Sequence, residues 1–132
     1  MRAEQWIKVL GWDGHEIDDL RTAGYAYIQQ GAYQIALTFF QGISILTAPT
    51  SYDFQTLGAL HLQLGDPLQA LEALDRALKL DSANLTAQLN RAKALLMLGK
   101  KPQAAAQAAA LMRTASAEIA SQAAALLLSL SA

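Results

Sequence analysis

The chain has 132 residues, of which 53% are apolar and only 16% charged, with a formal net charge of -1 and no cysteine. The near-zero charge and the absence of a basic run argue against nucleic acid or an anionic membrane as partner, and the lack of cysteine excludes disulfides and thiolate chemistry. A charged fraction of roughly a quarter is usual for globular domains. We therefore expect some apolar surface of this chain to lie against a partner.

The first 16 residues predict a short helix over about residues 2–11, closed by Gly11 and Gly14. This segment lacks an apolar run of signal-peptide length, and no run in the chain approaches the roughly 20 residues that span a bilayer. We therefore expect a cytoplasmic protein without membrane insertion. Trp6 and Leu10 share one face of this helix, and Ile7 adjoins it. These three residues either cap the following helices or form a homodimer or heterodimer contact.

From residue 17 onward the sequence repeats with a period of 34 residues. Several independent columns keep this period without an insertion. One column holds small residues, the next holds glycine and the third holds alanine. These columns are Gly24, Gly58 and Ala92; Gly31, Gly65 and Gly99; and Ala36, Ala70 and Ala104. A fixed period of this length indicates stacked supersecondary units that bury their apolar faces against their neighbours.

Each repeat reads as two helices. Gly31, Gly65 and Gly99 fall where the first helix of each repeat should end, because glycine accepts the left-handed backbone of a helix terminus. We expect helix pairs at about 17–30 and 33–46, at 51–64 and 67–80, and at 85–98 and 101–114, followed by a last helix at about 117–130. Alternating β-branched runs are absent, so we expect an all-α chain.

The residues in these columns resemble the tetratricopeptide repeat (TPR). The first copy reads Leu20-x-x-Ala23-Gly24-x-x-Tyr27, and the second reads Phe54-x-x-Leu57-Gly58-x-x-His61. The resemblance implies three TPR-like helix hairpins in a right-handed superhelix, with an N-terminal helix and a C-terminal capping helix. It implies one TPR domain over 1–132, divided into an N-terminal helix (1–16), three repeats (17–50, 51–84, 85–116) and a capping helix (117–132).

A narrower resemblance rests on the segments 31–46 and 52–59. They are similar to the TPR chaperones of bacterial type III secretion, the virulence-associated class that holds translocator subunits; a related class holds the needle subunit. The resemblance implies a cytoplasmic chaperone, not an enzyme, that masks an aggregation-prone secretion substrate before export. Because one fold hosts many functions, a TPR scaffold or adaptor subunit of a multiprotein complex is the alternative.

In TPR proteins the first helix of each pair lines the concave groove, which implies a set of client-binding residues here. The predicted client-binding residues are Arg21, Tyr25, Ile28, Tyr52, Gln55, Ala59, Leu62, Leu89, Lys93, Leu96 and Met97. This groove is mainly apolar, and Arg21 and Lys93 are its only predicted cations. The positions that grip acidic heat-shock chaperone tails in other TPR proteins are mostly unsuitable here. We therefore expect an extended or helical apolar client segment.

Catalytic, cofactor and metal sites are not expected. His15 and His61 are the only histidines. His61 occupies a column that is usually packed, and His15 lies among carboxylates at a solvated helix start. No glycine-rich phosphate loop or nucleophile elbow is present.

Overall fold

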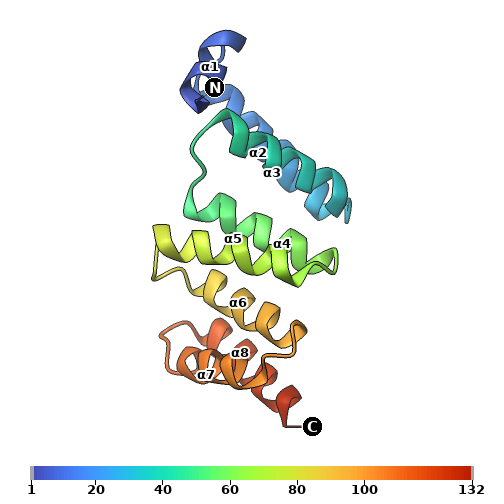
Figure 1. Ribbon diagram of the computed structural model, residues 1–132, viewed down its shortest axis with the longest axis vertical. Coiled ribbons are helices and arrows are strands. Elements are labelled where there is room, and N and C mark those ends of the chain that lie inside the picture. The colour runs from blue at the N-terminus through green and yellow to red at the C-terminus, as the bar shows by residue number, and fades with distance from the viewer. Residues whose placement is uncertain (1, 132) are drawn as a thin grey trace.

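The computed structural model describes residues 2–131, although within the first helix it leaves the side chains of Ala3, Glu4, Trp6 and Ile7 undescribed. These residues form eight helices and no strand, which confirms the all-α prediction. The helices follow one another down the long axis of the molecule (Figure 1). Their bounds are α1 Ala3–Leu10, α2 Gly14–Gln29, α3 Tyr33–Leu46, α4 Ser51–Gln63, α5 Pro67–Leu80, α6 Leu85–Met97, α7 Lys101–Leu111 and α8 Ala117–Leu130.

Polar side chains cap the starts of several helices, although α3 and α7 have no such cap. Asp13 and Glu16 form a capping box that starts α2 at Gly14, three residues before the predicted start. Thr50 and Asp53 form a second capping box at the start of α4. Asn84 caps α6 by accepting a hydrogen bond from the backbone N–H of Ala87 at 3.0 Å. Helix α7 ends at residue 111, three residues before the predicted end.

Glycine is required at two kinds of position. Gly31, Gly65 and Gly99 end α2, α4 and α6 with φ between 77° and 79°, which is the left-handed backbone predicted there. Gly24 and Gly58 allow the two helices of a hairpin to approach closely. A Cβ at Gly58 would lie 2.5 Å from Cγ of Leu74, and one at Gly24 would lie 2.7 Å from the ring of Phe40.

The core changes character along the stack. Its N-terminal part is built from large side chains of α2, α3 and α4, including Ile17, Phe40, Ile43 and Leu60. Its next part is built almost entirely from fully buried alanines of α5 and α6 around Leu74. Alanine buries little area but lets helices approach closely. The C-terminal helices close the stack over a third cluster.

The hairpins meet at two junctions. We call the boundary between α2–α3 and α4–α5 the first junction, and that between α4–α5 and α6–α7 the second junction. Over their fully described lengths, no Cα of α2 lies within 8 Å of a Cα of α4, whereas α4 and α6 do approach within this distance. From α2 to α8 each helix packs on the next one in the chain, and α1 packs on α3. Within residues 2–131, no helix is both long and apolar enough to cross a bilayer.

Candidate functional site: a groove pocket between three hairpins

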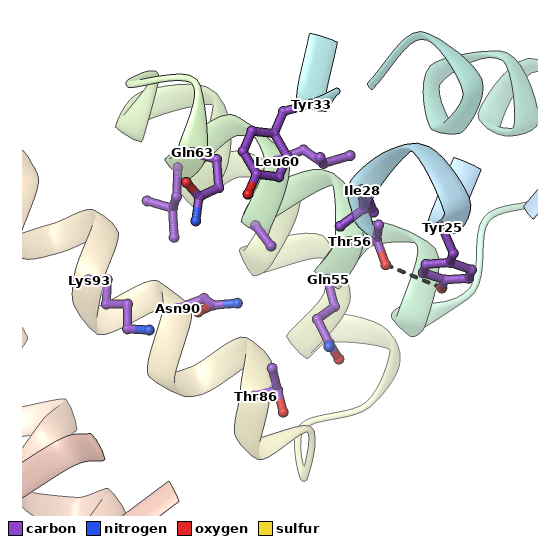
Figure 2. Close-up of a pocket in the computed structure, with 12 residues that line it drawn as sticks. Tyr25, Ile28, Tyr33, Gln55, Thr56, Leu60, Gln63, Thr86, Asn90 and Lys93 are labelled. Carbon is purple, nitrogen blue, oxygen red and sulfur yellow. Dashed lines mark hydrogen bonds between the residues drawn. The ribbon is translucent and has the colours of Figure 1, made fainter. Parts of the chain in front are cut away.

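The first helices of the three hairpins line a pocket of about 460 Å³ (Figure 2). We call it the groove pocket. A volume of this size suits a large side chain or a short peptide segment. Its lining residues are Tyr25, Ile28, Tyr33, Gln55, Thr56, Ala59, Leu60, Leu62, Gln63, Thr86, Asn90 and Lys93.

The groove pocket has two different sides. Side chains of α2 and of the start of α3 are apolar or aromatic, among them Ile28 and Tyr33. The side formed by α6 and by part of α4 carries amides, hydroxyls and one amine, as Figure 2 shows for Asn90, Thr86 and Lys93. Among the side chains that the structure describes, no carboxylate lies within 4.0 Å of the Lys93 amine. The pocket can therefore accept an apolar side chain on one side and polar backbone groups on the other.

Six of the predicted groove residues lie together in this pocket, and all six keep some exposed surface. They are Tyr25, Ile28, Gln55, Ala59, Leu62 and Lys93. The structure thus brings together more than half of the predicted set, drawn from all three repeats. Contact of these six residues with a client stays a prediction.

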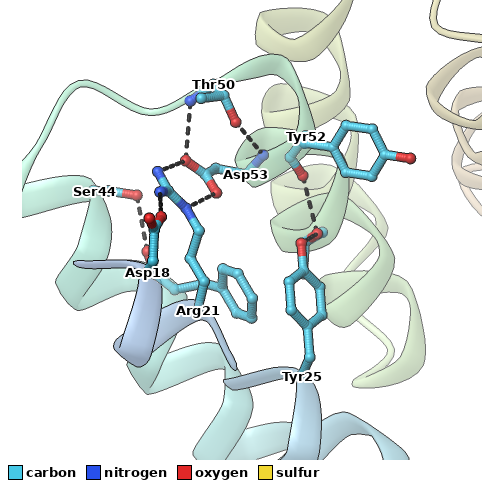
Figure 3. A network of polar contacts seen from close by, with 9 residues as sticks. Asp18, Arg21, Tyr25, Ser44, Thr50, Tyr52 and Asp53 are labelled. Carbon is cyan, nitrogen blue, oxygen red and sulfur yellow. Dashed lines mark hydrogen bonds and ion pairs between the residues drawn. The ribbon is translucent and has the colours of Figure 1, made fainter. Parts of the chain in front are cut away.

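The other five predicted residues do not line the pocket. Leu89 is only 2% exposed and packs with Leu111 and Ile119, so its prediction as a groove residue is wrong. Its position on α6 faces α7 and α8 instead of the groove. Tyr52 is 67% exposed but points away from Tyr25 (Figure 3).

Leu96 and Met97 lie at the C-terminal end of α6, outside the pocket lining. Met97 is 50% exposed. Arg21 also lies outside the pocket, because its guanidinium is engaged elsewhere. The prediction that Arg21 supplies a groove cation is therefore corrected, and Lys93 remains as a cation in the pocket lining.

Arg21 forms a two-pronged ion pair with Asp53 across the first junction (Figure 3). Its Nε donates to one carboxylate oxygen of Asp53 at 2.9 Å, and a terminal nitrogen donates to the other at 2.8 Å. The Asp53 side chain is only 1% exposed. Burial acts to raise the pKa of Asp53, but hydrogen bonds from Arg21 and from the Thr50 backbone outweigh it and hold this pKa below its ordinary value. Conversely, the hydrogen bond to Asp53 raises the pKa of Arg21.

Tyr25 joins the pocket to the core. Its ring packs edge-on against Phe40 with ring centroids 5.1 Å apart. Its hydroxyl lies 3.4 Å from the Thr56 hydroxyl. The Thr56 hydroxyl already donates to the carbonyl of Tyr52 at 2.9 Å, so the proton between the two hydroxyls comes from Tyr25. Tyr25 remains 38% exposed, and its ring forms part of the pocket wall.

The predicted client-binding set omits six residues of the pocket lining and also omits Asp53; the six are Tyr33, Thr56, Leu60, Gln63, Thr86 and Asn90. Tyr33 begins α3, and the repeat pattern assigns the groove to first helices only, so nothing in that pattern pointed to it. Asp53 was missed because an aspartate near a helix start reads as a solvated capping residue. The spacing Thr50-x-x-Asp53 could have located the capping box, but not the partner across the junction.

The other residues discussed in the sequence analysis do not line the groove pocket. Leu10 is 43% exposed and lines a shallow apolar cavity of about 280 Å³ with Ile45 and Leu46 of α3. The side chains of Trp6 and Ile7 lie outside the described residues, so their predicted role in dimerisation stays a prediction. His15 faces Asp19 at 3.7 Å, and no group of three potential metal ligands occurs among the described residues.

Comparison with solved structures identifies the fold. The type III secretion chaperone SycD of Yersinia enterocolitica, solved in complex with a peptide of the translocator YopD, superposes with a TM-score of 0.79 at 20% identity, over 89% of this chain and 93% of SycD. PcrH of Pseudomonas aeruginosa, solved with the chaperone binding region of PopD, has a TM-score of 0.76 at 26% identity, over 92% of this chain and 95% of PcrH. The chain has a TPR fold and resembles the type III secretion translocator chaperones.

The same TPR fold also matches a domain of another kind. The second TPR domain of human RPAP3, solved with an HSP70 peptide, has a TM-score of 0.77 at 17% identity, over 91% of this chain and 99% of that domain. No protein-family model matches the chain, and no curated protein matches it in sequence. The matches to solved structures confirm the fold predicted from the 34-residue repeat.

Proposed function

We propose that this chain is a cytoplasmic, non-enzymatic chaperone that holds an apolar segment of a type III secretion substrate, a translocator or a needle subunit, in the groove pocket before export. The observation that carries the proposal is the pocket itself, which opens on one face of α2, α4 and α6. SycD and PcrH, which share the fold, were solved with segments of the translocators YopD and PopD.

The lining of the pocket supports an extended or helical segment as the client. Ile28, Ala59 and Leu62 offer apolar contact, whereas the side chains of Gln55 and Asn90 make no hydrogen bond to any described residue. Such amides are free to pair with the backbone of a bound peptide. Burying roughly 300 Å² of apolar client surface would contribute about 7 kcal/mol before ordering costs.

Co-expression with the proteins encoded by genes adjacent to the gene of this chain tests the proposal. We expect one of them to become soluble only in the presence of this chain and to co-purify with it. Ile28→Asp and Leu62→Asp should each weaken that complex by at least about tenfold, which is about 1.4 kcal/mol. Leu68→Asp is the matched control, because Leu68 is an exposed leucine of α5 that lies outside the pocket and outside the predicted client-binding set. If Leu68→Asp weakens the complex as much as the pocket variants do, the pocket is not the specific site of the client.

The alternative is a scaffold that binds folded proteins, and one observation favours it. Ile35 and Ile45 of α3 are exposed. An apolar cavity lined by Trp12, Leu20 and Phe39 shares Gly42 and Leu46 with the cavity that Ile45 lines. A folded partner could cover such a face. The two functions differ in the state of the isolated partner. A chaperone client is insoluble or unfolded alone, whereas a scaffold partner gives a folded circular dichroism or NMR spectrum alone.

The predicted dimer also remains a proposal, since the exposed surface around Leu10 could be covered by a second copy. Sedimentation at tens of micromolar should then show a dimer, and a monomer alone would exclude it.

A further inference from the structure

At the first junction the first helices of the two hairpins, α2 and α4, are not in direct contact, whereas at the second junction α4 and α6 are. Over their described lengths, α2 and α4 come no closer than 8 Å between Cα atoms, whereas α4 and α6 do. The groove pocket includes side chains from both α2 and α4, so its width depends on how far these two helices stand apart. Whatever holds α2 at that distance also determines the shape of the pocket.

Two polar contacts bridge α2 and α4. The first is the pair of hydrogen bonds from Arg21 to the buried carboxylate of Asp53. The second, one helical turn further along both helices, joins the hydroxyls of Tyr25 and Thr56 at 3.4 Å. The first is the stronger restraint, because both partners are charged and a two-pronged arrangement fixes orientation as well as distance.

Asp53 is held in place by its own helix. Its second carboxylate oxygen also accepts the backbone N–H of Thr50 at 3.0 Å, while its own N–H donates to the Thr50 hydroxyl at 3.1 Å. On the other side, Asp18 accepts a third hydrogen bond from Arg21 at 3.1 Å. The exposed Asp18 carboxylate orients the guanidinium from its own helix, α2, whereas the buried Asp53 carboxylate is held by the start of α4.

We propose that Arg21 and Asp53 are positioning residues that set the distance between α2 and α4 and thereby the width of the groove pocket. Neither residue lines the pocket, so they act on a client through the placement of Tyr25 and Ile28 on α2. This effect on binding rests on the function proposed above, whereas the effect on helix spacing does not.

The helix spacing can be measured directly, because the chain has no cysteine of its own. Spin labels at Ala26 of α2 and Lys79 of α5 report the first junction by pulsed electron spin resonance. Labels at Lys79 and Ala109 of α7 report the second. All three positions are exposed. We expect Arg21→Met to shift and broaden the first distance distribution and to leave the second unchanged.

A matched control exists at the second junction. Arg91 of α6 donates to Asp75 of α5 at 2.7 Å in a more exposed ion pair, between helices that pack directly on each other. Arg91→Met should therefore leave both distances unchanged. Should Arg21→Met unfold because Asp53 is left buried without a partner, the double variant Arg21→Met, Asp53→Asn removes the buried charge and serves in its place. Arg21→Lys, which keeps a charge, should restore the wild-type distance at least in part.

Two outcomes would overturn the proposal. An unchanged first-junction distance in folded Arg21→Met or in the double variant would show that the pair does not set the spacing. A changed distance with unaltered affinity for the co-purifying client of the wild-type protein would show that the spacing does not govern binding. We expect at least about a tenfold loss of that affinity. If the wild-type protein has no such client, the proposed function fails, and the distance measurement still decides the role of the ion pair.

Discussion

The second hairpin, α4–α5, meets a neighbour on each side, and the two junctions are held by different kinds of contact. Towards the C-terminus, fully buried alanines such as Ala77 and Ala87 let α5 and α6 pack directly, and α4 approaches α6. Towards the N-terminus, α3 packs on α4, but α2 stands away from α4 and is tied to it by the ion pair of Arg21 and Asp53. The groove pocket extends across both junctions, and the looser junction lies on its apolar side.

This difference shows how a repeat stack can keep a binding surface open. Small residues at every junction would close the helices on one another and fill the space between them. An ion pair can hold two helices at a fixed separation without direct backbone contact, because the side chains of arginine and aspartate span a longer distance than two alanine methyl groups.

Removing the carboxylate of the first junction should have the largest effect on stability. Asp53→Ala leaves Arg21 without its buried partner and removes part of the cap of α4, so we expect a loss of about 3 kcal/mol or more in the free energy of unfolding. Urea denaturation measures this loss. Asp75→Ala, which breaks the exposed pair of the second junction, should cost less than about 1 kcal/mol. Equal losses in the two variants would contradict the distinction between the junctions.

Filling space inside a hairpin should have an intermediate effect. Gly58→Ala places a methyl group 2.5 Å from Cγ of Leu74, so α4 and α5 must shift, at a cost of about 1–3 kcal/mol. Gly42→Ala is the control, because no described heavy atom outside the local helix lies within 4 Å of the added Cβ. Gly42→Ala should be neutral or stabilising by up to about 1 kcal/mol, since alanine favours helix over glycine. Thermal unfolding of the two variants compares them.

Protonation of Asp53 at low pH should reduce the free energy of unfolding by less than Asp53→Ala does, because a protonated Asp53 still accepts hydrogen bonds. The pKa of Asp53 is lowered in the folded protein, so its contribution to stability is fully present above its ordinary pKa of 3.8 and is lost as the pH falls through the lowered folded value. The pKa of Asp13 is also lowered, by its hydrogen bonds with Glu16 and His15. Unfolding of wild type and Asp53→Asn between pH 5 and pH 2 isolates the Asp53 contribution, which should shrink towards low pH. A difference that is constant across this range would contradict this account.

The sequence predicted the fold well because each repeat column reflects the backbone conformation or the helix packing within its own hairpin. Gly65 marks a helix end through its backbone, and Gly58 marks the close approach of a helix pair through its missing side chain, whatever the rest of the chain does. The groove was predicted only in part. The local pattern does not show whether a position on a first helix faces the groove, the preceding helix or the following helix. Leu89 was misplaced for this reason. The pairing of Arg21 with Asp53 depends on how two hairpins are placed in space, and no local pattern encodes it.

The most direct test of the groove pocket as the client site is site-specific photo-crosslinking in the complex purified after co-expression. A photoreactive residue at Gln55, in the pocket, should join the chain to its client on irradiation. The same residue at Gln41, which lines a separate cavity with Phe54 and Arg76, should give no such product. A client crosslinked at Gln41 and not at Gln55 would contradict the account, because the client would then lie on another face of the stack.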